Sequence, residues 1–209
     1  MLKIYGRNNS SNVQKVIWTI NEIGIKFEQL NVGGEFGGIN NPAYLAKNPN
    51  SRIPTMEDEG FLLWESNSIV RYLSKKYDTG QLYPSDSKVC AIADQWMDWQ
   101  QTSVGQFIVP IFWGLVKTPE RDRDLELIEA SRVGMIELMQ ILDNHLADKR
   151  YVAGKNFTMG DIPLGIVVYR WLKLIKNRPK MVNLEKWYER LAKRPAFKVH
   201  VLGVSFVSN

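Results

Sequence analysis

Cysteine and histidine are scarce in this 209-residue chain, which contains one cysteine, Cys90, and two histidines, His145 and His200. A single cysteine cannot form an intramolecular disulfide, and this usage is typical of proteins kept in a reducing cytoplasm. The two histidines and the cysteine match no common spacing of metal ligands. The sequence therefore predicts a cytoplasmic protein with neither a disulfide framework nor a metal site.

Long hydrophobic runs are also missing, since no apolar stretch approaches the roughly 18 residues that suggest a membrane span. The first residues, MLKIYGRNNSS, lack the apolar core of a signal peptide and instead resemble a strand followed by a polar loop. The glycine-rich stretch 33–41 contains neither GxGxxG nor GK[ST]. We therefore expect no membrane partner and no phosphate-binding loop.

Charge is moderately positive, with a net charge of +5, and it is concentrated in residues 170–198, which are rich in lysine and arginine. A nucleic-acid surface would explain this segment. A solvated helical face explains it as well, and no aromatic-basic groove or nucleic-acid motif accompanies it. We therefore expect a soluble globular protein without a nucleic-acid partner.

The first 78 residues combine short strand-like runs with helical periodicity. Apolar residues recur at helical spacing in 13–24, and a Glu-Gly pair between two strand-like runs predicts a hairpin. The predicted elements are strand 2–6, helix 13–24, strand 25–32, short helix 42–48, strands 52–58 and 61–66, and helix 67–78. This βαβ-α-ββα order is typical of a mixed sheet with helices on its faces.

The remainder of the chain is predicted to be all-helical. A polar stretch with glycine and proline at 79–87 marks a boundary. The predicted helices are 88–116 interrupted by Pro110, one that starts with Pro119 in its first turn and runs to about 146, 162–176, 182–191, and a short piece after Pro195. The predicted organisation is an α/β domain at 1–79, a linker at 80–87 and an all-helical domain at 88–209.

The stretch from Asn48 to Tyr72 carries the features of a receptor for a peptide-like anion. Glu65 and Ser66 stand at a strand–helix junction, where free backbone N–H groups and the helix dipole attract a carboxylate. The proline after Ile53 favours extended backbone there, which can pair with a peptide ligand. Helix capping alone is the alternative explanation of the Glu-Ser pair.

Several motifs together resemble a known family. They are NPxxxIP at 48–54, WESNSIxRYL at 64–73, and Phe157-Thr158 with Asp161, which looks like a capping box. In this order they resemble the cytosolic glutathione transferases, in particular a serine-type, theta-like bacterial member. The resemblance implies a thioredoxin-like first domain, a cis peptide bond before Pro54, a homodimer, glutathione as co-substrate, and a role in detoxification.

The implied reaction is activation of the glutathione thiol as a thiolate that attacks a small, apolar electrophile. A thiol with a pKa of about 8.5 is mostly protonated at neutral pH, and a hydroxyl donor at a helix start can stabilise the thiolate. The resemblance assigns this role to Ser10, with Ser11 as the second candidate. Asn12, or Asn9, could donate through its side-chain amide instead.

Tyr5 is a rival donor, although its place in a strand also suits a structural aromatic. Two departures from the family pattern stand nearby, with Asn12 where proline is expected and Gln14 where a basic residue is common. These departures leave open a non-catalytic, glutathione-binding or regulatory protein. A glutathione-dependent isomerase or dehalogenase on the same scaffold is the other alternative.

The resemblance also implies two sets of binding residues. The residues assigned to glutathione are Arg52, Ile53, Pro54, Glu65, Ser66 and Asn40, with Asp98 or Gln101 reaching the glutathione of the partner subunit. The residues assigned to the electrophile pocket are Ile108, Phe112, Trp113 and Tyr169.

Overall fold

The computed structural model describes residues 1–206 and divides them into two units. The first unit contains Met1–Tyr83 and Pro195–Phe206, and the second contains Pro84–Arg194. The sequence pattern assigned all of 88–209 to the helical domain. The structure instead groups Pro195–Phe206 with the first unit, and residues 207–209 lie outside the described part of the chain.

The first unit is built on a four-stranded mixed sheet with strand order β2-β1-β3-β4. Its strands are β1 (Leu2–Tyr5), β2 (Phe27–Leu30), β3 (Thr55–Asp58) and β4 (Phe61–Trp64). β1 pairs in parallel with β2 and antiparallel with β3, and β3 pairs antiparallel with β4. Leu2 and Ile4 are buried, as the period of two in a strand with one apolar face predicts.

The β3–β4 hairpin turns through Glu59 and Gly60, as the sequence predicts. Both residues have positive φ, 51° and 86°, so the turn has the left-handed backbone that matches the twist of a two-residue hairpin. This turn sets the pairing of Asp58 with Phe61.

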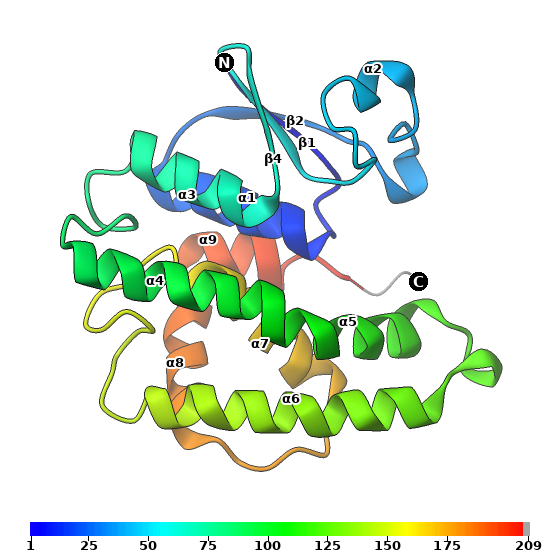
Figure 1. The fold of residues 1–209 in the computed structure, drawn as a ribbon, viewed down its shortest axis with the longest axis vertical. Helices are drawn as coiled ribbons and strands as arrows, with labels where there is room; N and C mark the ends of the chain where they lie inside the picture. The colour runs from blue at the N-terminus through cyan, green and yellow to red at the C-terminus, as the bar shows by residue number, and fades with distance from the viewer. Residues whose placement is uncertain (207–209) are drawn as a thin grey trace. The chain divides into compact units, whose positions relative to one another are not determined.

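Helices α1 and α3 lie side by side on one face of this sheet (Figure 1). The helical elements of the first unit before the linker are α1 (Ser11–Ile23), η1 (Gly34–Phe36), α2 (Pro42–Leu45) and α3 (Ser66–Tyr77). Apolar residues of both helices and of β1 and β3 form one core: Leu2, Ile4, Val13, Val16, Ile17, Ile20, Met56, Ile69 and Leu73. The α/β architecture predicted for the first domain is therefore confirmed.

The C-terminal segment joins this unit through aromatic packing. It consists of α9 (Pro195–Phe197) and η5 (Lys198–Leu202). The rings of Trp18 on α1 and Phe197 lie edge to face, with centroids 4.6 Å apart, and both residues are fully buried. Such long-range aromatic contact leaves no periodic signal in the sequence, which explains why the pattern did not predict this grouping.

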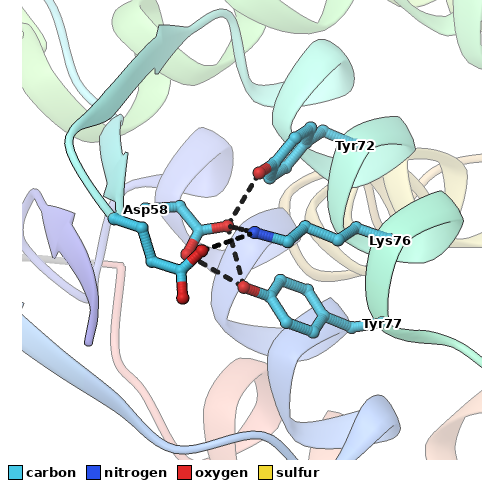
Figure 2. A network of polar contacts seen from close by, with 5 residues as sticks. Asp58, Tyr72, Lys76 and Tyr77 are labelled. Carbon is cyan, nitrogen blue, oxygen red and sulfur yellow. Dashed lines mark hydrogen bonds and ion pairs between the residues drawn. The ribbon is translucent and has the colours of Figure 1, made fainter.

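A buried carboxylate ties the hairpin to α3. Asp58 accepts hydrogen bonds from Tyr72 and Tyr77, and the ammonium group of Lys76 lies 2.8 Å from its Oδ2 (Figure 2). Burial alone would raise the pKa of Asp58, but the hydrogen bonds from Lys76, Tyr72 and Tyr77 outweigh that effect and lower it. The network therefore requires the ionised form of Asp58.

The second unit is helical. Its elements are α4 (Ser87–Trp99), η2 (Gln100–Val104), α5 (Gly105–Phe112), η3 (Trp113–Lys117), η4 (Glu120–Asp122), α6 (Leu125–His145), α7 (Asp161–Leu174) and α8 (Val182–Ala192). Pro110 lies inside α5 without ending it, and wider π-helical turns flank that helix.

The helix predicted to start at Pro119 begins later. The backbone at Glu120–Asp122 forms a short 3-10 turn, and α6 starts at Leu125. The side chain of Asp124 accepts a hydrogen bond from the N–H of Leu127, so this residue caps the helix.

Helix α7 starts at a fully buried carboxylate, Asp161. Its oxygens accept hydrogen bonds from the N–H groups of Val152 and Thr158 and from Nε1 of Trp187, at 3.0, 2.9 and 2.8 Å. Burial raises the pKa of Asp161 to about 6, and these donors oppose the rise. Asp161 therefore joins the preceding turn, the start of α7 and a residue of α8. Among the described residues, no helix has the length and apolarity needed to span a bilayer.

We expect Asp58→Asn to lower the free energy of unfolding by about 1–3 kcal/mol at pH 7, because an amide NH2 would face hydroxyl and ammonium donors. A carboxylate whose pKa is lowered on folding stabilises the protein above its unfolded value of about 3.9, and this contribution is lost as the pH falls through the folded value. Urea unfolding at pH 7 and pH 3 should therefore show a difference between wild type and variant that shrinks in acid.

The matched control is Glu59→Gln, which removes an exposed carboxylate 3.4 Å from the same lysine. It should change the free energy of unfolding by less than about 0.5 kcal/mol. Equal effects of the two substitutions would contradict the stabilising role assigned to Asp58.

We expect Asp161→Asn to destabilise the helical unit by about 2–4 kcal/mol, because an amide can supply only one acceptor oxygen where two oxygens serve three N–H donors. Asp148→Asn, which changes an exposed carboxylate, is the control. Thermal and urea unfolding would give the loss of stability in each variant. A loss below about 0.5 kcal/mol for Asp161→Asn would refute the capping argument.

Candidate functional site

The start of α1 presents the residues predicted to activate a thiol. Ser10 has extended backbone (φ −80°, ψ 126°) and is the N-cap residue of α1, yet its side chain makes no capping hydrogen bond. Ser11 is the first residue of the helix, and both serines are half-buried. Because the N-cap hydroxyl is not used to satisfy the helix, it remains available as a donor at the positive end of the helix dipole.

The hydroxyl of Tyr5, the rival donor, is already used. It donates to Oε2 of Glu57 at 2.7 Å, and the lysines Lys3 and Lys47 also lie within 3.4 Å of this carboxylate. Burial, together with the bond to Glu57, raises the pKa of Tyr5 to about 12. The hydrogen bonds that Glu57 accepts from Tyr5, Lys47 and Lys3 together lower the pKa of its carboxyl to about 2, against the opposing effect of burial. Tyr5 therefore belongs to a structural network.

The chain before Pro54 is held by side chains of the preceding segment. The carbonyl oxygen of Arg52 accepts from the hydroxyl of Tyr44 at 2.6 Å and from Nδ2 of Asn48 at 2.9 Å. Both side chains also reach Oγ1 of Thr55, at 2.9 and 3.1 Å. The peptide bond between Ile53 and Pro54 is cis, as the resemblance implies.

Arg52 and Asn40 are both exposed, and Asn40 is bound to the same segment. The hydroxyl oxygen of Ser51 lies within hydrogen-bond distance of two acceptors, the carbonyl oxygen of Ile39 at 3.0 Å and Oδ1 of Asn40, which share its single hydrogen. This contact holds the glycine-rich loop against the chain that leads into Pro54. Sequence reasoning identified Asn48 as a motif residue but missed Tyr44 and Ser51, which have no local signal.

Glu65 and Ser66 stand at the start of α3. Glu65 has φ 72° and ψ 111°, a conformation that non-glycine residues rarely adopt, and its side chain makes no capping hydrogen bond. Backbone of this kind costs about 1–3 kcal/mol and is concentrated at functional sites. Glu65 is exposed and Ser66 is buried. Capping alone therefore does not explain this pair.

The starts of α1 and α3 come together in space. The Oγ of Ser66 lies 3.3 Å from Oδ1 of Asn12, although 54 residues separate them in the chain. Nζ of Lys15, one turn further along α1, lies 3.4 Å from Oγ of Ser66 and 3.2 Å from Oδ1 of Asn67. Sequence reasoning missed Lys15. The only available signal was its spacing of three from Asn12 and four from Thr19, which places the three on one helical face.

The predicted residues of the second unit lie on five of its elements. Asp98 on α4 and Gln101 on η2 are both exposed, within one helical turn of each other. The remaining ones are Ile108 and Phe112 on α5, Trp113 at the start of η3, and Tyr169 on α7.

Their surroundings differ from one to the next. Ile108 and Tyr169 are buried, Trp113 is 60% exposed, and the guanidinium of Arg170 lies 4.4 Å from the centre of the Phe112 ring. Burial raises the pKa of Tyr169. Within residues 1–206, no group of three or more acidic, histidine or cysteine side chains is arranged to hold a metal.

Comparison with known proteins gives a consistent result over nearly the whole chain. Residues 4–81 match the family model of the glutathione S-transferase N-terminal domain, and residues 105–195 match that of the C-terminal domain. Glutathione S-transferase GstB of Escherichia coli is 37% identical over 208 residues, covering 98% of this chain and 100% of that protein. Glutathione S-transferase F11 of Arabidopsis thaliana is 28% identical over 205 residues, and the match covers 95% of this chain and 96% of that protein.

Solved structures agree with these relatives. The theta class glutathione S-transferase of Xanthomonas axonopodis pv. citri, with glutathione bound, superposes with a TM-score of 0.94 at 42% identity, covering 99% of each chain. Its apo form gives 0.86 at 37% identity. The resemblance inferred from the motifs, the predicted fold and the predicted transferase are confirmed. The chain therefore belongs to the glutathione S-transferase family.

Proposed function

We propose that this protein binds glutathione at the adjacent starts of α1 and α3 and activates its thiol with the hydroxyl of Ser10. The main support for this proposal is the position of Ser10. It is the N-cap residue of a 13-residue helix, so its hydroxyl lies at the positive end of the helix dipole, and the hydroxyl makes no capping hydrogen bond. The bound thiolate would then attack a small, apolar electrophile.

The free energy needed to stabilise the thiolate is within reach of a single hydrogen bond from the hydroxyl of Ser10. Lowering a thiol pKa by two units requires roughly 2.7 kcal/mol of preferential thiolate stabilisation. A hydrogen bond to a charged group contributes about 1.5–3 kcal/mol, and the helix dipole adds to it. The competing hydroxyl of Tyr5 donates to Glu57 and has a pKa raised to about 12, which favours Ser10 over it.

The binding of glutathione is proposed to use the strained backbone at Glu65. The Glu65 carboxylate would face the ammonium group of the γ-glutamyl residue, and the hydroxyl and N–H of Ser66 would face its α-carboxylate. The backbone of Ile53 would pair with the cysteinyl amide, beside Pro54. Arg52 or Asn40 would approach the glycyl carboxylate. The bound glutathione of the Xanthomonas axonopodis relative supports this class of ligand.

The electrophile pocket is proposed to use the apolar side chains Ile108, Phe112 and Trp113, with Tyr169 nearby in the fold of the second unit. We also propose that the protein is a cytoplasmic homodimer. In it, Asp98 or Gln101 would reach the glutathione bound by the partner subunit. Light scattering of the purified protein would measure the oligomeric state, and a mass of one chain would refute the dimer.

We expect Ser10→Ala to raise the pKa of bound glutathione by roughly one to two units, because the thiolate loses a hydrogen-bond donor. Calorimetry should first show that wild type and variant bind glutathione with similar affinity. Thiolate absorbance followed against pH then gives the pKa of the bound thiol in each.

Two variants serve as controls for this experiment. Ser11→Ala removes the neighbouring hydroxyl, and Tyr5→Phe removes the rival one; both should leave the pKa of the bound thiol within about 0.3 units of wild type, a shift worth roughly 0.4 kcal/mol. An unchanged pKa in Ser10→Ala, with a shift in either control, would identify a different donor. A bound thiol with the pKa of free glutathione in wild type would indicate binding without activation.

A further inference from the structure

Lys15 is a buried lysine on the helical face that meets the start of α3. Only 4% of its surface is exposed, and it lies one turn after Asn12 on α1. Lysine is almost never this deeply buried unless other groups satisfy it. The contacts of its side-chain nitrogen therefore require an explanation.

Two of these contacts lie in the first turn of α3. Nζ of Lys15 is 3.4 Å from Oγ of Ser66 and 3.2 Å from Oδ1 of Asn67. The same Ser66 oxygen is 3.3 Å from Oδ1 of Asn12, and Ser66 itself is 5% exposed. A buried hydroxyl at a helix start is thus placed between a lysine and an amide oxygen.

The hydrogen-bonding capacity of these groups fixes the direction of each bond. An ammonium group only donates, whereas a hydroxyl has one hydrogen and two acceptor lone pairs. Lys15 must therefore occupy a lone pair of Ser66, and the hydroxyl hydrogen must point elsewhere. In the structure it points to Oδ1 of Asn12. When an anion arrives at the start of α3, the same hydrogen can turn to it while Lys15 keeps its place.

We propose that Lys15 is a positioning residue for glutathione, acting through Ser66 on the α-carboxylate of the γ-glutamyl group. It holds Ser66 as a hydrogen-bond donor and adds positive charge at the first turn of α3, where the helix dipole has the same sign. This inference rests on the proposed function. It assigns to the first helix a second role, distinct from the thiol activation proposed for Ser10.

A purely structural role for Lys15, as a link between α1 and α3, predicts something different. Loss of such a link would weaken every ligand of the site to a similar extent. Loss of a carboxylate-positioning residue weakens only ligands that carry the carboxylate. A matched pair of ligands separates the two roles: glutathione, and 4-aminobutyryl-cysteinyl-glycine, which keeps the amino group and the thiol but lacks the α-carboxylate.

The test compares wild type with Lys15→Met, which keeps the length of the side chain and removes its charge. By calorimetry, Lys15→Met should weaken the binding of glutathione by about 10- to 100-fold, the size expected for the loss of a charge-assisted hydrogen-bond network. Its affinity for the analogue should change by less than about threefold. In turnover, KM for glutathione should rise while kcat and the pKa of the bound thiol stay near wild type.

Two further variants serve as controls. Lys26→Met removes the same charge from an exposed position just after α1 and should leave the affinity for both ligands unchanged. Lys15→Gln, which is polar and shorter, serves if the methionine variant does not fold. A double-mutant cycle with Ser66→Ala should show that the effect of Lys15→Met falls to less than a third once the hydroxyl is gone.

The outcomes distinguish the two proposals. If wild type binds no glutathione, the proposed function fails and this inference fails with it. If wild type binds glutathione and the Lys15 variants lose affinity for both ligands to the same extent, only the role of Lys15 is overturned. The same conclusion holds if these variants lose affinity for neither ligand. Full additivity with Ser66→Ala would also overturn it, because Lys15 would then not act through that hydroxyl.

Discussion

The packing of α1 along α3 is the constraint on which the site of the first unit depends. Both helices bury apolar residues against the same face of the sheet, and this shared core brings their first turns together. Each helix start offers backbone N–H groups and a partial positive charge. Two such ends in contact favour negative charge, and the hydrogen bond that Ser66 donates to Oδ1 of Asn12 joins them.

Around these helix starts, side-chain hydrogen bonds hold backbone that has no regular structure. Tyr44 and Asn48 share the carbonyl of Arg52, and Ser51 holds the loop that contains Asn40. The positive φ of Glu65 is kept in place because β4 ends immediately before it and α3 begins immediately after it. The cost of this unusual conformation is offset by the core that the two elements form.

Each of the two units contains a buried aspartate that accepts several hydrogen bonds. Asp58 in the first unit and Asp161 in the second are buried carboxylates that collect donors from segments distant in the chain. The balance between burial and hydrogen bonding differs, so the pKa of Asp58 is lowered and that of Asp161 is raised. In both cases the acid orients the start of an element or the approach of a helix.

Much of the fold could be predicted because its signals are local. Apolar periodicity placed α1, α3, α7 and α8 within a few residues of their observed bounds, and Glu59-Gly60 marked the hairpin. The same reasoning failed at Pro119, because α6 begins only after its cap at Asp124. It also gave no sign that Pro195–Phe206 packs with the first unit, where Phe197 contacts Trp18 of α1. Helix boundaries depend on single side-chain bonds, which periodicity does not encode.

The sequence by itself determined the order of elements, the family motifs at Asn48–Pro54 and Trp64–Leu73, and the two helix starts that carry Ser10 and Ser66. Only the tertiary structure decided that these starts meet, that Tyr5 is engaged by Glu57, and that Lys15 lies beside Ser66. The physical reason is separation along the chain. Each of these bonds joins residues more than fifty positions apart, so they exist only once the sheet and its helices have packed.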